Sequence, residues 1–76
     1  MNEIHKPRPR VRLEDGVFWI HGPYAYPIEE DRIEDERDLL AWVRHLSRKT
    51  WADRKLIGEF IDVVADVKDF NLRIDK

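Results

Sequence analysis

The chain has 76 residues, contains no cysteine and carries a formal net charge of −2 at pH 7. This length suits one small domain, and 42% hydrophobic with 39% charged residues excludes a disordered chain of low hydrophobicity. Without cysteine, disulfides and thiolate metal sites are excluded. The N-terminal residues lack an apolar signal segment and no run is long enough to span a membrane, so we expect a cytoplasmic protein with no membrane contact.

Charge is strongly segregated along the chain. Residues 1–13 hold four basic residues and one acid, residues 29–38 hold seven acids and two arginines, and residues 44–55 hold five basic residues and one acid. Such blocks can steer a charged partner or pair with each other inside the monomer. They also suggest a homodimer, in which the basic residues near one N-terminus meet the acidic run of a second copy; such a dimer would dissociate at high salt.

Residues 1–9 are predicted to form a flexible basic arm, because Pro7 and Pro9 favour an extended chain. Residues 10–21 then form a β-hairpin, since Asp15-Gly16 between two alternating runs is typical of a two-residue turn. The register of that turn divides the side chains between two faces. The face predicted to be buried carries Val11, Leu13, Phe18 and Ile20; the other carries Arg10, Arg12, Glu14, Val17, Trp19 and His21.

The segment after the hairpin is predicted to be a third strand or an extended loop. Tyr24, Tyr26 and Ile28 would line one face, while Pro27 restricts any strand to the edge of the sheet. A first helix follows the acidic run, capped by Asp31 or Asp35 and ending near residues 48–49. Its apolar positions are Leu39, Trp42, Val43 and Leu46.

A second helix is predicted from Thr50, as N-cap, to a stop at Asn71. Its apolar arc contains Leu56, Ile57, Phe60, Ile61, Val63, Val64 and Val67, and a solvated stripe contains Lys55, Glu59, Asp62 and Asp66. Gly58 would mark close approach of the helices, and residues 72–74 a tail or short strand. The predicted fold is α+β, one domain over residues 10–76 in which the hairpin, with or without the third strand, packs against a two-helix hairpin.

Residues for catalysis or metal binding are not arranged as either chemistry requires. Ser47 and Thr50 lie where helix capping explains them. His5, His21 and His45 lack the spacing of a zinc site, and the glycines form no phosphate-binding loop. We therefore expect no enzyme, no metal and no cofactor.

A stripe of basic and aromatic residues is the candidate partner-binding surface. Its members are Lys6, Arg8, Arg10, Arg12, Trp19 and His21. Three interpretations remain open. The stripe docks on a protein with Trp19 and Arg12 as anchors, it binds nucleic acid through phosphates and base stacking on Trp19, or Arg12 lies over Trp19 as an internal cation–π pair.

Residues 40–51, followed by Phe60 and Ile61, resemble a pattern of small phage and prophage proteins, W-x-x-H-L-x-x-K-x-W with a short second helix. The resemblance covers about a third of the chain, and the pattern carries no established activity. It implies an accessory protein that binds and modulates a host protein of defence, transcription or replication, as anti-CRISPR proteins do, in the host cytoplasm. It transfers no functional residue to this chain.

Overall fold

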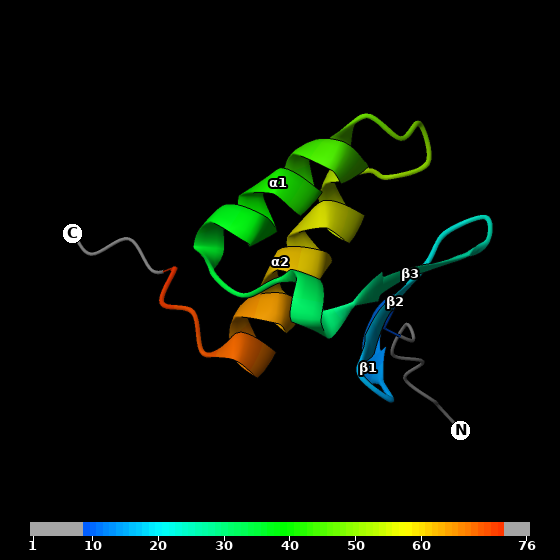
Figure 1. Cartoon of the computed structure of the whole chain (residues 1–76). Coiled ribbons are helices and arrows are strands. Elements are labelled where there is room, and N and C mark those ends of the chain that lie inside the picture. The colour runs from blue at the N-terminus through cyan, green and yellow to red at the C-terminus, as the bar shows by residue number, and fades with distance from the viewer. Residues whose placement is uncertain (1–8, 73–76) are drawn as a thin grey trace, which may run out of the picture.

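Three antiparallel strands and two helices make up the computed structural model, which describes residues 9–72 (Figure 1). The strands β1 (Val11–Glu14), β2 (Val17–His21) and β3 (Ala25–Glu29) are followed by a short 3-10 helix, η1 (Glu30–Arg32), and by α1 (Glu36–Ser47) and α2 (Arg54–Lys68). The sheet order is β1-β2-β3. The α+β class and the third strand are therefore confirmed. Lys6, Arg8 and nearly all of the predicted arm lie outside the described residues.

The hairpin has the predicted turn and register. Asp15 and Gly16 both adopt positive φ, at 53° and 76°, as a two-residue turn of this type requires. Val11 pairs with Ile20 and Arg12 with Trp19. The two faces of β1 and β2 therefore carry the side chains that the sequence assigns to them.

β3 can contain Pro27 because the backbone of this residue faces the free edge of the sheet. The backbone N–H of Glu30 donates to the carbonyl oxygen of Gly16 over 2.9 Å. Hydrogen-bonded and non-hydrogen-bonded pairs alternate along antiparallel strands, so Ile28 bonds to β2 and Pro27 turns its backbone to the free edge. A proline there removes a donor that would otherwise be open to pairing with another strand.

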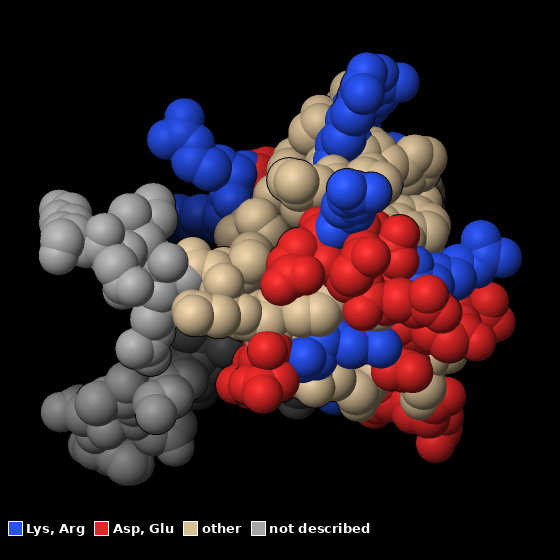
Figure 2. All heavy atoms as spheres, turned by 60° about the vertical axis from the view of Figure 1, so that its left-hand side comes forward, with Lys and Arg blue, Asp and Glu red and all other residues tan. Residues whose placement is uncertain are grey.

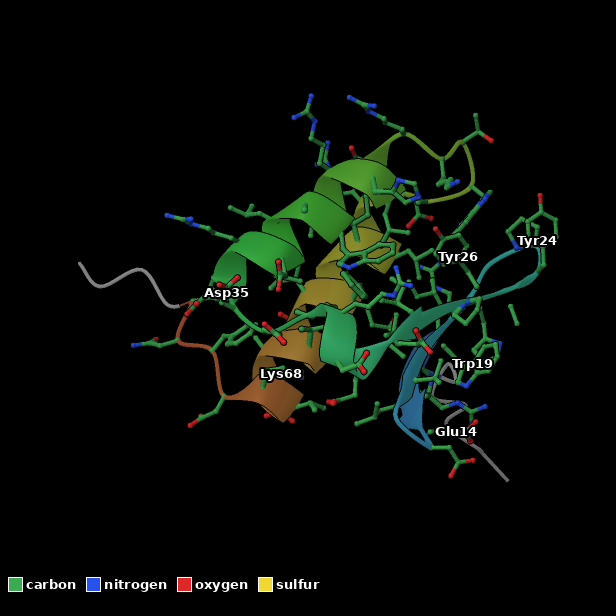
Figure 3. All side chains as sticks on the ribbon, in the orientation of Figure 1. Glu14, Trp19, Tyr24, Tyr26, Asp35 and Lys68 are labelled. Atoms are coloured by element: carbon green, nitrogen blue, oxygen red, sulfur yellow. The ribbon has the colours of Figure 1, made fainter. Side chains whose placement is uncertain are left out.

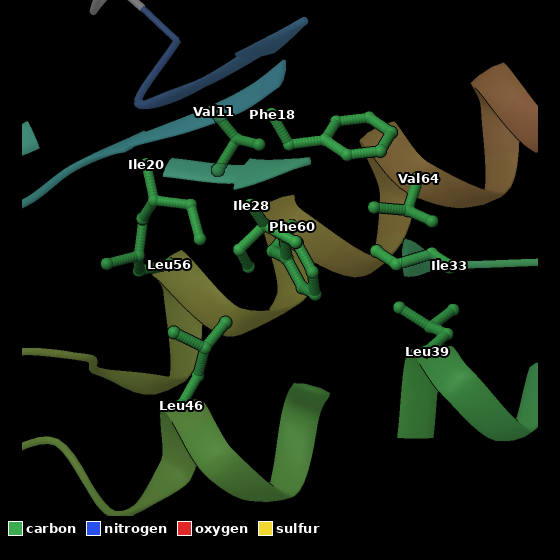
Figure 4. Close-up of a cluster of buried hydrophobic side chains, with 10 residues drawn as sticks. All are labelled: Val11, Phe18, Ile20, Ile28, Ile33, Leu39, Leu46, Leu56, Phe60 and Val64. Carbon is green, nitrogen blue, oxygen red and sulfur yellow. The ribbon is translucent and has the colours of Figure 1, made fainter. Parts of the chain in front are cut away.

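Both helices lie on one face of the sheet, and the core lies between this face and the helices (Figures 1 and 4). The buried side chains are Val11, Phe18, Ile20, Ile28, Ile33, Leu39, Leu46, Leu56, Phe60 and Val64. Phe18 and Phe60 meet edge to face, with ring centroids 6.4 Å apart. Burial of this set supplies the main driving force for folding.

Leu13, which was expected on the buried face of the hairpin, is 38% exposed. It lies beside the turn, in a strand at the edge of the sheet, so the prediction that it is buried was wrong. Tyr24, predicted to share a face with Tyr26 and Ile28, precedes β3 in the turn after β2 and is 68% exposed.

The ends of the helices confirm one predicted cap and correct two predictions. Asp35 caps α1 by accepting the N–H of Asp38 over 3.0 Å. For α2 the N-cap is Asp53, which accepts the N–H of Leu56 over 2.8 Å, and not Thr50. The C-cap is Asp69, in the left-handed region, and not Asn71.

Thr50 does not cap α2 because Trp51 packs away from the helix. The ring of Trp51 lies on Tyr26, with centroids 5.7 Å apart, and a Cβ added to Gly22 would come within 2.7 Å of it. Helical backbone starting at Thr50 would remove Trp51 from this contact. Gly58 also differs from expectation, since a Cβ there would meet nothing within 4 Å and the helices do not approach closely at that point.

Three residues of the W-x-x-H-L-x-x-K-x-W pattern, His45, Lys49 and Trp51, contact Tyr26. His45 hydrogen-bonds to the Tyr26 hydroxyl over 3.0 Å, Lys49 lies 5.5 Å from the ring centroid, and Trp51 contacts the ring. Trp42 packs edge-on against His45, and Leu46 is buried in the core. In this chain the pattern therefore fastens the helical hairpin to β3.

Candidate binding face of the sheet

The sheet face opposite the helices is uncovered by any other described element. We call it the outer face; its side chains from β1 and β2 are Arg12, Glu14, Val17, Trp19 and His21, and those from β3 are Ala25, Pro27 and Glu29. Figure 3 shows Trp19 pointing away from the helices. Trp19 is half-buried, although no core residue lies on this side.

Trp19 lies in a shallow groove of about 390 Å³. Val17 and Pro27 line it beside Trp19, and Trp42 of α1 contributes from beyond the edge of β3. Arg32 and Glu29 stand at the rim, 3.3 Å apart as an exposed ion pair. The arrangement is an aromatic side chain among apolar neighbours, surrounded by charges of both signs.

Arg12 is exposed and lies beside Trp19 in the register. Its Nη2 atom is 4.0 Å from Oε2 of Glu14, and both side chains are more than half exposed, so this ion pair holds Arg12 only weakly. Among the described residues the cation–π contact is that of Lys49 with Tyr26, and Arg12 makes none with Trp19. The internal cation–π interpretation of Arg12 and Trp19 was therefore wrong.

Arg10 is bound to α2 and does not belong to a free basic stripe. Its Nη2 lies 3.3 Å from Oδ1 of Asp53, and its Nε lies 4.0 Å from Oε1 of Glu59. The N–H of Leu56 and the guanidinium of Arg10 lower the pKa of Asp53 below its ordinary value of 3.8. Arg10 thus connects the start of β1 to the start of α2.

Glu59 closes the free edge of β1, contrary to the prediction that it belongs to a solvated stripe. Its Oε2 accepts the backbone N–H groups of Arg10 and Val11 over 2.6 and 3.0 Å. Val11 turns its N–H away from β2, so without Glu59 this donor would be open to another strand. The periodicity of α2 could not reveal this contact because it joins residues far apart in the sequence.

His21 lies at the end of β2 and is exposed. Together with Pro9, Arg10 and Arg12 it lines a second hollow, of about 560 Å³. Of the six predicted stripe residues, the structure therefore groups Arg12, Trp19 and His21 on the outer face. It directs Arg10 toward α2, and Lys6 and Arg8 lie outside the described residues.

The prediction missed the surroundings of Trp19. Trp19 pairs with Pro27 and Val17 with Glu29, so β3 supplies one side of the groove. The alternating segment after the hairpin was the available signal, because a third antiparallel strand beside β2 places these residues opposite each other.

The described residues contain no group of three or more histidine or acidic side chains placed to hold a metal ion. Over the same part of the chain, neither helix has the length and apolar character needed to cross a membrane. In comparisons with known proteins, no family model, no curated protein and no solved structure matches the chain.

Proposed function

We propose that this chain is a non-enzymatic binding protein that docks on another protein through the outer face. The observation that carries the proposal is the placement of Trp19 in an apolar groove on an otherwise uncovered sheet face. Tryptophan and arginine are the side chains that most often anchor protein interfaces. Trp19 would fill the centre of the interface, with Arg12 and Arg32 at its rim.

The outer face is a better docking surface than either edge of the sheet. At one edge the carboxylate of Glu59 accepts the N–H of Val11, and at the other edge Pro27 has no N–H. Strand addition needs rows of free donors and acceptors. The partner would therefore contact side chains on the outer face more than the backbone at its edges.

The charges of the outer face favour a protein partner over nucleic acid, the alternative for this surface. Arg12 and Arg32 are each accompanied by a carboxylate, Glu14 and Glu29 respectively, and a phosphate backbone would be repelled by both acids. A protein surface can supply charges of either sign. The resemblance to phage accessory proteins supports a host protein as partner, in the host cytoplasm.

Affinity capture from bacterial lysate tests the proposal. Tagged wild-type protein, Trp19→Ala and the control Leu40→Ala are compared with and without nuclease treatment. Leu40 is 68% exposed on α1, away from the outer face, so each substitution removes a large apolar side chain that solvent reaches. We expect one protein to be retained in stoichiometric amount by wild-type and Leu40→Ala and lost by Trp19→Ala.

The three proteins must show the same helical circular dichroism, which separates loss of binding from unfolding. Equal retention by Trp19→Ala and wild-type would rule out the outer face as the docking surface. Loss of all retained protein on nuclease treatment would rule out direct protein binding.

A further inference from the structure

A second charged surface lies where α1 ends and α2 begins. We call it the basic end; its cations are Arg44, Arg48, Lys49, Arg54 and Lys55. Asp53 is the acid within this stretch, and it is engaged by Arg10 and by the N–H of Leu56. Most of the positive charge of the basic end is therefore not balanced by a nearby acid.

The side chains of four of these cations form no ion pair and no hydrogen bond among the described residues, although the charge of Lys55 acts on Asp53. Within the described residues no ion pair or hydrogen bond involves the side chain of Arg44, Arg48, Arg54 or Lys55, and all four are exposed. At the opposite end of the helices Lys68 pairs with Glu30 over 2.9 Å. The cations of the basic end are thus available to an external anion.

Helix stability does not explain the two cations in the first turn of α2. Cations are unfavourable at the N-terminus of a helix. The first turn of α2 nevertheless contains Arg54 and Lys55 and no acid, although its N-cap is Asp53 and Lys68 lies in its last turn. Figure 2 shows acidic side chains gathered over one part of the surface and Lys and Arg side chains projecting at the top of the view.

An exposed aromatic ring lies at the same end of the molecule. Gly22 lies against Trp51 in the loop between the helices, and its N–H donates to the carbonyl oxygen of Tyr24. Tyr24 is 68% exposed, and Figure 3 shows its ring projecting from the tip of this turn. The contact of Gly22 with Trp51 therefore places the turn that carries Tyr24 beside the loop between the two helices.

We propose that the basic end binds single-stranded nucleic acid. The four free cations would contact successive phosphates, and a base would stack on Tyr24, the combination that sequence-tolerant single-strand binding uses. A hollow of about 290 Å³ between Arg44, His45 and Arg48 offers a place for one phosphate. The acidic opposite end orients the protein so that only the basic end approaches a polyanion. This site is separate from the outer face.

Fluorescence anisotropy with a fluorescein-labelled oligothymidylate tests the proposal. Arg48→Ala/Arg54→Ala should weaken binding about tenfold or more, because two phosphate contacts are lost. The control Arg37→Ala/Lys68→Ala removes the same charge at the opposite end of the helices and should change affinity less than about twofold. The logarithm of the wild-type binding constant should fall with the logarithm of salt concentration with a slope of about −3, for four phosphates on a single strand.

Tyr24→Ala tests the stacking contact and should weaken binding about fivefold or more, with Leu40→Ala as control. No binding at low salt, or equal losses in the two double variants, would overturn the proposal. So would salt-sensitive self-association without oligonucleotide binding, which would assign the basic end to the acidic end of a second copy.

Discussion

Glu59 shows how one side chain connects two elements of this fold. It accepts the backbone N–H groups of Arg10 and Val11 and lies near the Arg10 guanidinium. Charge-assisted hydrogen bonds of this kind are stronger than neutral ones. β1, whose side chains include Arg12, is therefore held against α2 by a contact that an isolated hairpin would lack.

We expect Glu59→Ala to lower the free energy of unfolding by about 2 kcal/mol, because it leaves two backbone donors without their acceptor. Urea denaturation measures the loss. Asp62→Ala is the control, since Asp62 is exposed on the same helix and should have little effect. Equal losses in both variants would show that the Glu59 contacts contribute nothing specific.

Replacing Gly22 or Gly58 by alanine should change the stability of the protein in opposite directions. Gly22→Ala places a Cβ within 2.7 Å of the Trp51 ring, and such overpacking should destabilise the protein by about 1–3 kcal/mol. Gly58→Ala meets nothing within 4 Å inside α2 and should stabilise it by about 1 kcal/mol. Thermal unfolding of both variants checks the pair; destabilisation by Gly58→Ala would indicate a contact not seen here.

At the scale of elements, the cap of α2 makes stability depend on pH. The pKa of Asp53 in the folded protein is below its ordinary value of 3.8, chiefly because of the N–H of Leu56. A depressed pKa means that ionised Asp53 stabilises the fold fully above about pH 4, and that this stabilisation is lost as pH falls through the lowered pKa.

Asp53→Asn keeps an acceptor for the N-cap but removes this titration. We expect wild-type to be more stable than Asp53→Asn at neutral pH, with the difference shrinking below about pH 4. Chemical denaturation at a series of pH values measures the difference. A constant difference from neutral to acid pH would contradict the assigned role of the charge.

Local signals predicted the elements well. The Asp15-Gly16 turn alone fixes the hairpin register, and the acidic residues before α1 include its cap, Asp35. The start of α2 could not be predicted this way, because the capping pattern at Thr50 competes with packing of Trp51 on Tyr26. Tertiary contact decides such cases over local propensity.

The candidate site was predicted only in part, for the same reason. Alternation placed Arg12, Trp19 and His21 on one face, and the structure confirms it. The attachment of Arg10 to α2 and the position of Pro27 beside Trp19 depend on how separate elements meet. The sequence of the hairpin alone contains neither contact.

At the scale of the whole molecule, charges of one sign gather at each end of the helical pair. Lys68 and Glu30 show that the end of α2 lies beside the acidic run that precedes α1. α1 has 12 residues, so the acidic and basic ends are about 18 Å apart along the helix. Salt at physiological strength screens beyond about 8 Å, so repulsion within each end outweighs attraction between the ends.

We therefore expect added sodium chloride to raise the melting temperature, by a few degrees. Calorimetry at low and high ionic strength checks this. A melting temperature that falls with salt would show that attraction between the ends dominates.

The most direct test of the outer face is a nuclear magnetic resonance titration of the three indole N–H signals. Trp51 contacts Tyr26 away from the groove, whereas Trp19 lies on the outer face and Trp42 lines the same groove from α1. Adding the protein retained in the affinity capture should shift or broaden the Trp19 signal first and most. An unchanged Trp19 signal together with a shift of the Trp51 signal would contradict the outer face as the binding surface.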